Sequence, residues 1–446
     1  MAKKGSITYV CQHCGQTHSS WMGKCSACGE WNTIIEQLDT AALAAPAGKQ
    51  LTYKEANAIT SQDEAPRIKS DLVEVDTVLG GGFVPGSVTL IAGQPGIGKS
   101  TLMLQLAYAA AKQHKVLYVS GEESVNQVGL RAKRLGANHA NLMLTSSTST
   151  DDIAATIAAN KFDLVVVDSI QTITVSTVSS AAGSVSQITN SAHMLMQAAK
   201  RSNTALLLVG HVTKEGSIAG PKVLEHVVDV VLQLEGDRYG GFKMLRSAKN
   251  RYGSTHESAI FEMKNEGLVP VDNPSAALLE ERQVSDGSVV LATLEGARPL
   301  LVEVQALVQT TSYGYPKRTA SGIDLNRLNL LIAMLERRTK LQLGDKDIYL
   351  NIVGGIKISE PAADLAVCMA IASAAKGMQL KTDAVVFGEV GLSGEVRRVP
   401  FADKRIAEAK KLGFKAAITP KKTGEKPGFV HEVADIKSAL NTFLSK

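Results

Sequence analysis

The segment Gly93-Gln94-Pro95-Gly96-Ile97-Gly98-Lys99-Ser100 constrains the fold of this 446-residue chain more than any other. It follows the apolar run 88–92 directly and opens a helical pattern at Ser100. A glycine-rich loop between a strand and a helix lets backbone N–H groups approach phosphate oxygens, and the helix N-terminus favours their negative charge. The segment therefore predicts a phosphate-binding loop. The alternative, a plain glycine-rich turn with a solvated lysine, does not explain the strand and helix on either side.

This loop is expected to hold ATP. Lys99 would contact the β- and γ-phosphates, and the Ser100 hydroxyl would bind Mg²⁺. The predicted ATP-binding residues are Gly93, Gln94, Pro95, Gly96, Ile97, Gly98, Lys99, Ser100 and Thr101.

Short apolar runs alternate with helical patterns in the middle of the chain. The runs do not alternate polar and apolar residues, which is typical of parallel strands covered by helices on both faces. Helical patterns span 100–112 and 188–201, and the runs are 88–92, 116–119, 164–167 and 205–209. This alternation predicts a doubly wound α/β domain.

Acidic residues follow two of these runs. Asp168 ends the run 164–167 and is expected to hold Mg²⁺, although a cap on the next segment is the alternative. Glu122 and Glu123 follow the run 116–119, where a carboxylate can act as general base toward the attacking water. The sequence does not decide which of the two does so, and both could be solvated surface charges.

Four of the five cysteines fall into two pairs near the N-terminus, Cys11, Cys14, Cys25 and Cys28. Each Cys-x2-Cys pair offers two thiolates on one turn, and together they form a tetrahedral site suited to Zn²⁺, with iron left open. Four protein ligands leave no open coordination position, so the role is structural. We interpret His13 and His18 as bystanders.

The two tryptophans and the fifth cysteine are expected to have structural roles. Trp21 and Trp31 are expected to pack against the cysteine turns, because so small a module has little else to bury. Base stacking is the alternative. Cys368 lies in an apolar helical stretch and is expected in the core.

Four regions follow one another along the chain. The last opens with strand candidates at 289–294 and 300–308 and continues with helices at 324–339 and 361–376, so it predicts a separate α+β unit. The predicted limits are 7–35 for the zinc finger, 36–66 for a linker, 67–280 for the ATPase domain and 281–446 for the C-terminal domain.

Composition sets wide limits on function. Hydrophobic residues make up 44% and charged residues 20% of the chain, which excludes disorder over its whole length. The net charge of +5 permits a nucleic-acid partner without arguing for one. There is no run of about eighteen apolar residues and no apolar segment after the basic start. We therefore expect no membrane association and a cytoplasmic protein.

The ATPase segments together resemble the RecA/DnaB-type ATPase core. In that family a polar residue that senses the γ-phosphate follows the fourth strand, which implies this role for His211; a histidine held by a loop carbonyl is the alternative. The segments that carry the resemblance are 92–101, 121–124, 164–168 and 210–214.

The order of cysteine finger, RecA-like ATPase and C-terminal domain resembles the RadA (Sms) family of bacterial DNA-repair proteins over essentially the whole chain. The family motif Lys-Asn-Arg-Phe-Gly stands here as Lys249-Asn250-Arg251-Tyr252-Gly253, with a tyrosine in place of the phenylalanine. The resemblance implies that these residues bind DNA or couple ATP use to it, for example by reaching a neighbouring subunit's nucleotide. A solvated basic turn is the alternative.

The same resemblance implies a function. It implies a hexameric, ATP-driven helicase that promotes branch migration on single-stranded or branched DNA, with a RecA-type recombinase as a partner. Candidate DNA loops are 214–222 and the segment at Lys249.

The C-terminal region resembles the proteolytic domain of Lon protease at 354–364 and 388–396. In Lon a serine follows the proline, but this position is Ala362 here. The catalytic lysine aligns approximately with Asp403, one residue before Lys404, and Ser359 has the wrong spacing to replace the serine. Without a nucleophile acyl transfer cannot start, so protease activity is not expected.

In the RadA family this domain instead helps to form the ring and to bind DNA. A local basic character fits that role, although each residue could equally belong to a solvated helix face. The basic residues are Lys317, Arg318, Arg327, Arg337, Arg338 and Lys340.

Two other classes of function compete with a DNA motor. One is an ATP-dependent protease, which Ala362 opposes. The other is a nucleotide-gated switch or scaffold that binds partners without translocation.

Overall fold

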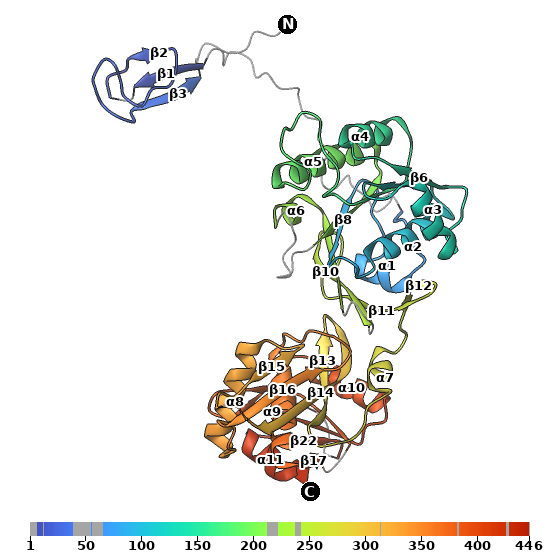
Figure 1. Ribbon diagram of the computed structural model, residues 1–446, viewed down its shortest axis with the longest axis vertical. Coiled ribbons are helices and arrows are strands. Elements are labelled where there is room, and N and C mark those ends of the chain that lie inside the picture. The colour runs from blue at the N-terminus through green and yellow to red at the C-terminus, as the bar shows by residue number, and fades with distance from the viewer. Residues whose placement is uncertain are drawn as a thin grey trace. The chain divides into compact units, whose positions relative to one another are not determined.

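The computed structural model divides into two compact units, Met1–Glu64 and Ala65–Lys446 (Figure 1). The described residues are 7–11, 13–38, 55, 66–211, 222–236, 242–312, 314–380, 383–424 and 428–445. Most of the predicted linker and residues 214–221 of the candidate loop 214–222 therefore lie outside the described residues.

The first unit contains a three-stranded antiparallel sheet in the order β2-β1-β3. Its strands are β1 Ile7–Cys11, β2 Thr17–His18 and β3 Ile34–Leu38. The buried apolar cluster among its described residues consists of Cys11, Cys25 and Ile34. So small a core cannot stabilise a fold alone, which makes the cysteine cluster structurally necessary.

The second unit contains a sheet in which nine strands are described, in the order β12-β11-β10-β9-β4-β8-β7-β5-β6. The strands from β9 to β6 in this order run parallel. They are β4 Val88–Gly93, β5 Val116–Ser120, β6 Leu142–Ser146, β7 Leu164–Asp168, β8 Ala205–His211 and β9 Val230–Gly236.

Helices cover both faces of this sheet, as the doubly wound prediction requires. One buried cluster joins the sheet to α1 Val73–Leu79, α2 Lys99–Ala111 and α3 Val125–Arg134. Another joins the opposite face to α4 Thr150–Ala159, α5 Val185–Ser202 and α6 Lys222–Val227. The four predicted strands and both predicted helices are confirmed with ends shifted by a few residues.

An antiparallel extension of the sheet was not anticipated from the sequence. It consists of β10 Phe242–Asn250, β11 Ser258–Lys264 and β12 Gly267–Pro270, which pair in succession beyond β9. These strands mix charged and apolar residues, so they lack the continuous apolar signature of the central strands.

The C-terminal part contains a mixed sheet with seven described strands in the order β15-β16-β14-β13-β18-β21-β22. They are β13 Ser288–Glu295, β14 Arg298–Thr310, β15 Arg318–Ser321, β16 Lys346–Ile352, β18 Ala384–Val386, β21 Ala416–Pro420 and β22 Val430–Val433. Two small pairs join β17 Gln379–Leu380 to β23 Leu444–Ser445 and β19 Glu389–Val390 to β20 Val396–Arg397.

Helices complete this α+β part. They are α7 Pro274–Leu279, α8 Leu325–Thr339, the short 3₁₀ helix η4 Pro361–Ala363, α9 Asp364–Lys376, α10 Ala402–Lys411 and α11 Ile436–Phe443. The predicted helix at 324–339 begins after Asp324, whose carboxylate caps it by accepting the Arg327 N–H. Cys368 is fully buried in α9, which confirms its assignment to the core.

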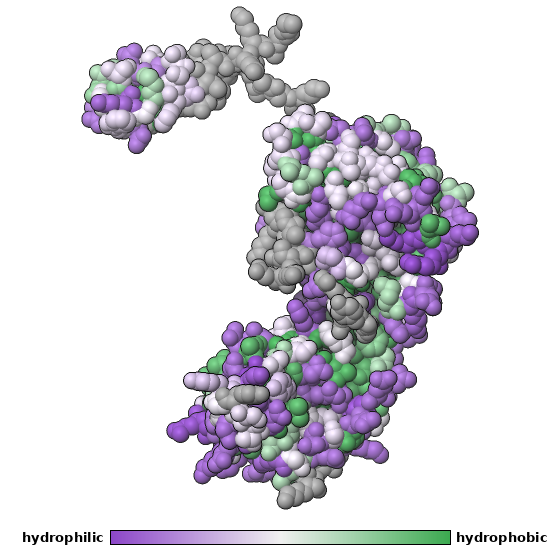
Figure 2. All heavy atoms as spheres, in the orientation of Figure 1, coloured by the Kyte–Doolittle hydropathy of each residue, from purple (hydrophilic) through white to green (hydrophobic). Residues whose placement is uncertain are grey.

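Large apolar side chains are exposed on several elements of the described chain, for example Val73, Leu130 and Leu392. On the face shown in Figure 2, hydrophobic and hydrophilic residues are mixed over most of the surface. Of the helices that the structure describes, none has the length and apolar character that a membrane crossing needs.

Candidate functional site

The phosphate-binding loop connects β4 to α2 as the sequence predicts. Gly93 tolerates no side chain, because a Cβ atom there would lie 2.6 Å from the Leu234 carbonyl oxygen of β9. Gly98 has a φ of 112°, a conformation that residues with a side chain rarely adopt. Both glycines are therefore required by the path of the backbone into α2.

Lys99 lies at the start of α2 with its ammonium group inside the loop. Its Nζ donates hydrogen bonds to the carbonyl oxygens of Gly93 at 2.8 Å and Gln94 at 3.0 Å. Burial lowers the pKa of Lys99 to about 8, although the Asp168 and Glu122 carboxylates act in the opposite direction. The Lys99 ammonium group is thus bound to two backbone carbonyl oxygens. Phosphate oxygens of a bound nucleotide would take the place of these two carbonyl oxygens as its partners.

Asp168 is the last residue of β7 and is nearly buried. Its Oδ2 accepts a hydrogen bond of 2.7 Å from the hydroxyl of Tyr118, a residue of β5. Burial and the neighbouring Asp168 carboxylate raise the pKa of Tyr118 well above its usual value, so the phenol keeps its proton.

Glu122 and Glu123 have different partners, although they are adjacent. Glu122 Oε1 accepts a hydrogen bond of 2.8 Å from the hydroxyl of Ser169, the residue after Asp168. Glu123 instead pairs with Arg131 of α3, with 2.5 Å between Oε1 and the guanidinium nitrogen. The Glu122 carboxylate therefore belongs to the site formed with Asp168, and the Glu123 carboxylate is committed to the packing of α3.

His211 ends β8 beside Glu122. Its Nε2 lies 3.5 Å from Glu122 Oε1, while Nδ1 is buried and has no hydrogen-bond partner among the described residues. The histidine thus reaches the same carboxylate as Ser169 from a neighbouring strand. Ser100 and Thr101 lie in the first turn of α2, directly after Lys99.

The motif Lys249 to Gly253 lies elsewhere on the sheet. Lys249 of β10 pairs with Val231 of β9, which pairs with Leu90, three residues before the loop begins at Gly93. The motif therefore lies toward the amino end of β4, and the loop lies at its carboxyl end. It does not join the ATP site of its own chain.

Most polar groups of this motif contact nearby backbone. Lys249 Nζ donates to the carbonyl oxygens of Glu225 at 2.6 Å and Val228 at 2.7 Å, near the end of α6. Asn250 bonds the last carbonyls of α1, and Tyr252 is half-buried next to it. Arg251 is the exception, because its side chain is 53% exposed while it pairs with the buried Asp229 at 3.0 Å.

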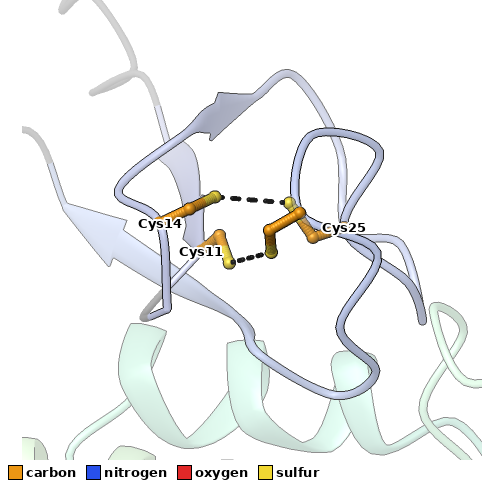
Figure 3. A group of neighbouring side chains, drawn as sticks. Cys11, Cys14 and Cys25 are labelled. Atoms are coloured by element: carbon orange, nitrogen blue, oxygen red, sulfur yellow. Dashed lines mark hydrogen bonds between the residues drawn. The ribbon is translucent and has the colours of Figure 1, made fainter.

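The four N-terminal cysteines converge as predicted (Figure 3). Their sulfur atoms all lie within 4.8 Å of one another, and the pairs Cys11–Cys28 and Cys14–Cys25 are 3.7 Å apart. A tetrahedral zinc site with Zn–S bonds of about 2.3 Å places its sulfurs about 3.8 Å apart. The spacing of the thiols therefore fits a zinc ion.

Thiol acidity fits the same ion. The Cys28 backbone N–H lowers the pKa of Cys25 to about 6, which favours the thiolate that zinc requires. A hydrogen bond from the Glu30 backbone lowers the pKa of Cys28, but burial and the neighbouring cysteines outweigh it and raise this pKa to about 12. Four thiolates cannot share this space without a cation, so the donor set calls for a metal.

Three side chains near the cysteines refine the interpretation of this module. His18 Nε2 lies 3.5 Å from Cys25 Sγ, so His18 contacts one of the four thiols. Trp21 and Trp31 lie beside Gly23, two residues before Cys25, as the predicted packing against the cysteine turns requires, but they are not buried there, because they stay 59% and 67% exposed. The short strands enclose too little space for two indole rings, and Lys24 Nζ covers the Trp31 ring at 5.5 Å.

The protease-like segment contains no serine after Pro361. Ala362 is buried, and its carbonyl accepts the Gly388 N–H at 2.8 Å. The preceding Glu360 forms a two-pronged ion pair with Arg405, which is fully buried. A backbone hydrogen bond and a buried ion pair thus hold the segment at 360–362.

Several site residues were missed from the sequence: Tyr118, Ser169, Arg131 and His18. Tyr118 had a usable signal, since a tyrosine inside an aliphatic buried run needs a partner for its hydroxyl. The other contacts depend on side-chain directions that sequence spacing does not provide.

Family models match three parts of the chain. A model described as an AAA domain matches residues 55–217, and one described as a rubredoxin metal binding domain matches residues 9–36. A model described as subunit ChlI of Mg-chelatase matches residues 330–423. The core is thus a RecA-like ATPase domain, preceded by a four-cysteine zinc ribbon and followed by a ChlI/Lon-like domain.

Curated relatives match over the full length. DNA repair protein RadA of Bacillus subtilis (strain 168) is 48% identical, and the match covers 100% of both chains. DNA repair protein RadA of Aquifex aeolicus (strain VF5) is 47% identical and covers 94% of each chain. A crystal structure of the RadB recombinase matches 46% of this chain and 100% of its own chain at 23% identity, with a TM-score of 0.37.

Metal analysis tests the cysteine cluster. The purified protein should contain about one zinc ion and no iron per chain, and Cys25→Ser should lose most of it because a tetrahedral site loses one ligand. Cys368→Ala, a change to the buried cysteine of α9, should keep the metal. Iron in the wild type, or unchanged metal content in Cys25→Ser, would contradict the zinc site.

Nucleotide affinity should depend on pH through Lys99. Phosphate contact raises the pKa of a lysine that has a pKa of about 8 in the free protein. Affinity should therefore be constant below about pH 8 and fall by up to about tenfold per unit above it.

Calorimetry in two buffers of different ionisation enthalpy would measure the associated proton uptake. Uptake should be present above about pH 8 and absent near about pH 6.5, where Lys99 is already charged. Affinity that stays constant up to about pH 9.5 would show that Lys99 does not titrate in this range.

Proposed function

Because this chain belongs to the RadA family of DNA repair proteins, we propose that it is a DNA-dependent ATPase that works as a hexameric motor on single-stranded or branched DNA. The convergence of Lys99, Glu122, Asp168 and His211 at one edge of a parallel sheet is the main observation in support. Branch migration and unwinding are the activities proposed for the motor.

ATP hydrolysis follows from the positions of these groups. Lys99 would exchange its two carbonyl partners for phosphate oxygens, which carry more charge. Ser100 and Asp168 would hold Mg²⁺, which neutralises charge on the β- and γ-phosphates. The residues fit this ion, since a hydroxyl and a carboxylate are hard oxygen ligands.

Glu122 is the proposed general base. Ser169 donates to its Oε1, and a carboxylate held in one orientation can accept a proton from water in line with the γ-phosphate. His211 lies against the same oxygen and is the proposed sensor of the γ-phosphate. Movement of either partner would change the orientation of the base.

A ring of subunits would give the motif from Lys249 to Gly253 a role at the ATP site. The motif lies toward the amino end of β4, away from the nucleotide of its own chain. Arg251 is exposed there and could contact a neighbouring subunit. An arginine that reaches the γ-phosphate of an adjacent subunit would couple hydrolysis to subunit movement.

DNA is the proposed substrate of that movement. The C-terminal basic residues, such as Lys317 and Arg337, would contact the phosphate backbone without reading sequence. A RecA-type recombinase is a further proposed partner, as the family's role in repair suggests. A nucleotide-gated switch remains the second candidate, because its ATPase site would have the same residues.

Substitution of each glutamate by glutamine separates their roles. Glu122→Gln should lower the turnover number by about 100-fold or more while ATP still binds, because the amide cannot accept the proton. Glu123→Gln is the matched control and should change turnover by less than about threefold, since Glu123 pairs with Arg131. The opposite order of effects would assign the base to Glu123.

DNA dependence is measured by phosphate release with and without single-stranded DNA. The wild type should be stimulated, and Arg251→Ala should lose most of the stimulation because the exposed guanidinium is gone. Asp229 keeps a hydrogen bond from the Val88 N–H in this variant but loses its ion pair, so circular dichroism must show that the variant is folded before the stimulation is compared. The exposed Arg201 provides a matched arginine control.

Basal turnover that DNA does not change would reject the motor and favour the nucleotide-gated switch. Stimulation that Arg251→Ala retains in full would leave the motor in place and remove Arg251 from the coupling.

A further inference from the structure

Tyr118 places a single hydroxyl group inside the sheet beneath the nucleotide site. The residue is 1% exposed, and its ring belongs to the core between the sheet and α2. Tyr118 pairs with Val166 across β5 and β7, and Asp168 follows two residues later on the same face. The phenol therefore extends along the strands, and its hydroxyl reaches Asp168 Oδ2 at 2.7 Å.

A phenylalanine at position 118 would fill nearly the same space and would bring no buried hydroxyl that needs a hydrogen-bond partner. The hydroxyl is buried, so its value lies in the hydrogen bond that it donates. That bond occupies one carboxylate oxygen of Asp168 and restricts rotation of the carboxylate. Oδ1 is left as the oxygen that can face a cation or its water.

We propose that Tyr118 is a positioning residue for metal binding: its hydroxyl holds Asp168 Oδ2 so that Oδ1 is directed to the Mg²⁺ of the bound nucleotide. The inference rests on the proposed role of Asp168 in holding that ion. Hydrogen bonds to metal-binding carboxylates orient the ligand, and their loss typically weakens metal affinity by about 10- to 100-fold. Nucleotide contacts that do not involve the metal should be unaffected.

The test uses Tyr118→Phe in the full chain, with a fluorescent non-hydrolysable ATP analogue as the probe. Binding is measured over a series of Mg²⁺ concentrations and separately in EDTA. The Mg²⁺ concentration for half-maximal binding should rise by about tenfold or more, while binding in EDTA stays at the wild-type value. Retained binding in EDTA also shows that the ATPase domain of the variant is folded.

Two further variants make the outcomes distinct. Tyr108→Phe removes the hydroxyl of a half-buried tyrosine on α2 that packs on the same core, and it should match the wild type. Asp168→Asn should raise the Mg²⁺ requirement at least as much as Tyr118→Phe.

If Asp168→Asn raises the Mg²⁺ requirement and Tyr118→Phe does not, the inference about Tyr118 is overturned and the metal role of Asp168 stands. If Asp168→Asn has no effect, the metal role itself is overturned. If Tyr118→Phe weakens binding equally with Mg²⁺ and in EDTA, the tyrosine supports the fold of the site and not the metal.

Discussion

Parallel pairing of four neighbouring strands is the constraint on which the ATP site depends. Strands that run in one direction end at one edge, so residues far apart in sequence meet there. Gly93 pairs with His211, and Asp168 pairs with both Ser120 and Val209. Any shift of register would separate the lysine, the two carboxylates and the histidine, whatever their identity.

This dependence explains which parts of the ATP site could be predicted from the sequence. The apolar runs predict β4, β5, β7 and β8, and the glycine spacing predicts the loop, because both signals are local. Side-chain partners are not local: the choice of Ser169 for Glu122 and of Arg131 for Glu123 follows from the path of α3 and the turn after β7. The extension from β10 to β12 was missed because charged residues interrupt its apolar runs.

The cysteine module and the ATPase domain are stabilised in different ways: metal ligation dominates in the module, and apolar burial dominates in the ATPase domain. Its apolar core is so small that metal ligation must supply what burial cannot, and this leaves Trp21 and Trp31 at the surface. The expectation of buried rings failed because it assumed that a small fold would bury its largest side chains. A fold held by a metal has no such need.

The ion pair of Glu360 with Arg405 limits what a single substitution could do to the C-terminal domain. A serine at position 362 would be buried two residues after Glu360, and position 403, which aligns approximately with the Lon lysine, holds an aspartate. Removing Glu360 would leave the fully buried Arg405 guanidinium without its partner. Changing Ala362 alone would therefore disturb the packing of the interior without bringing a serine and a lysine together.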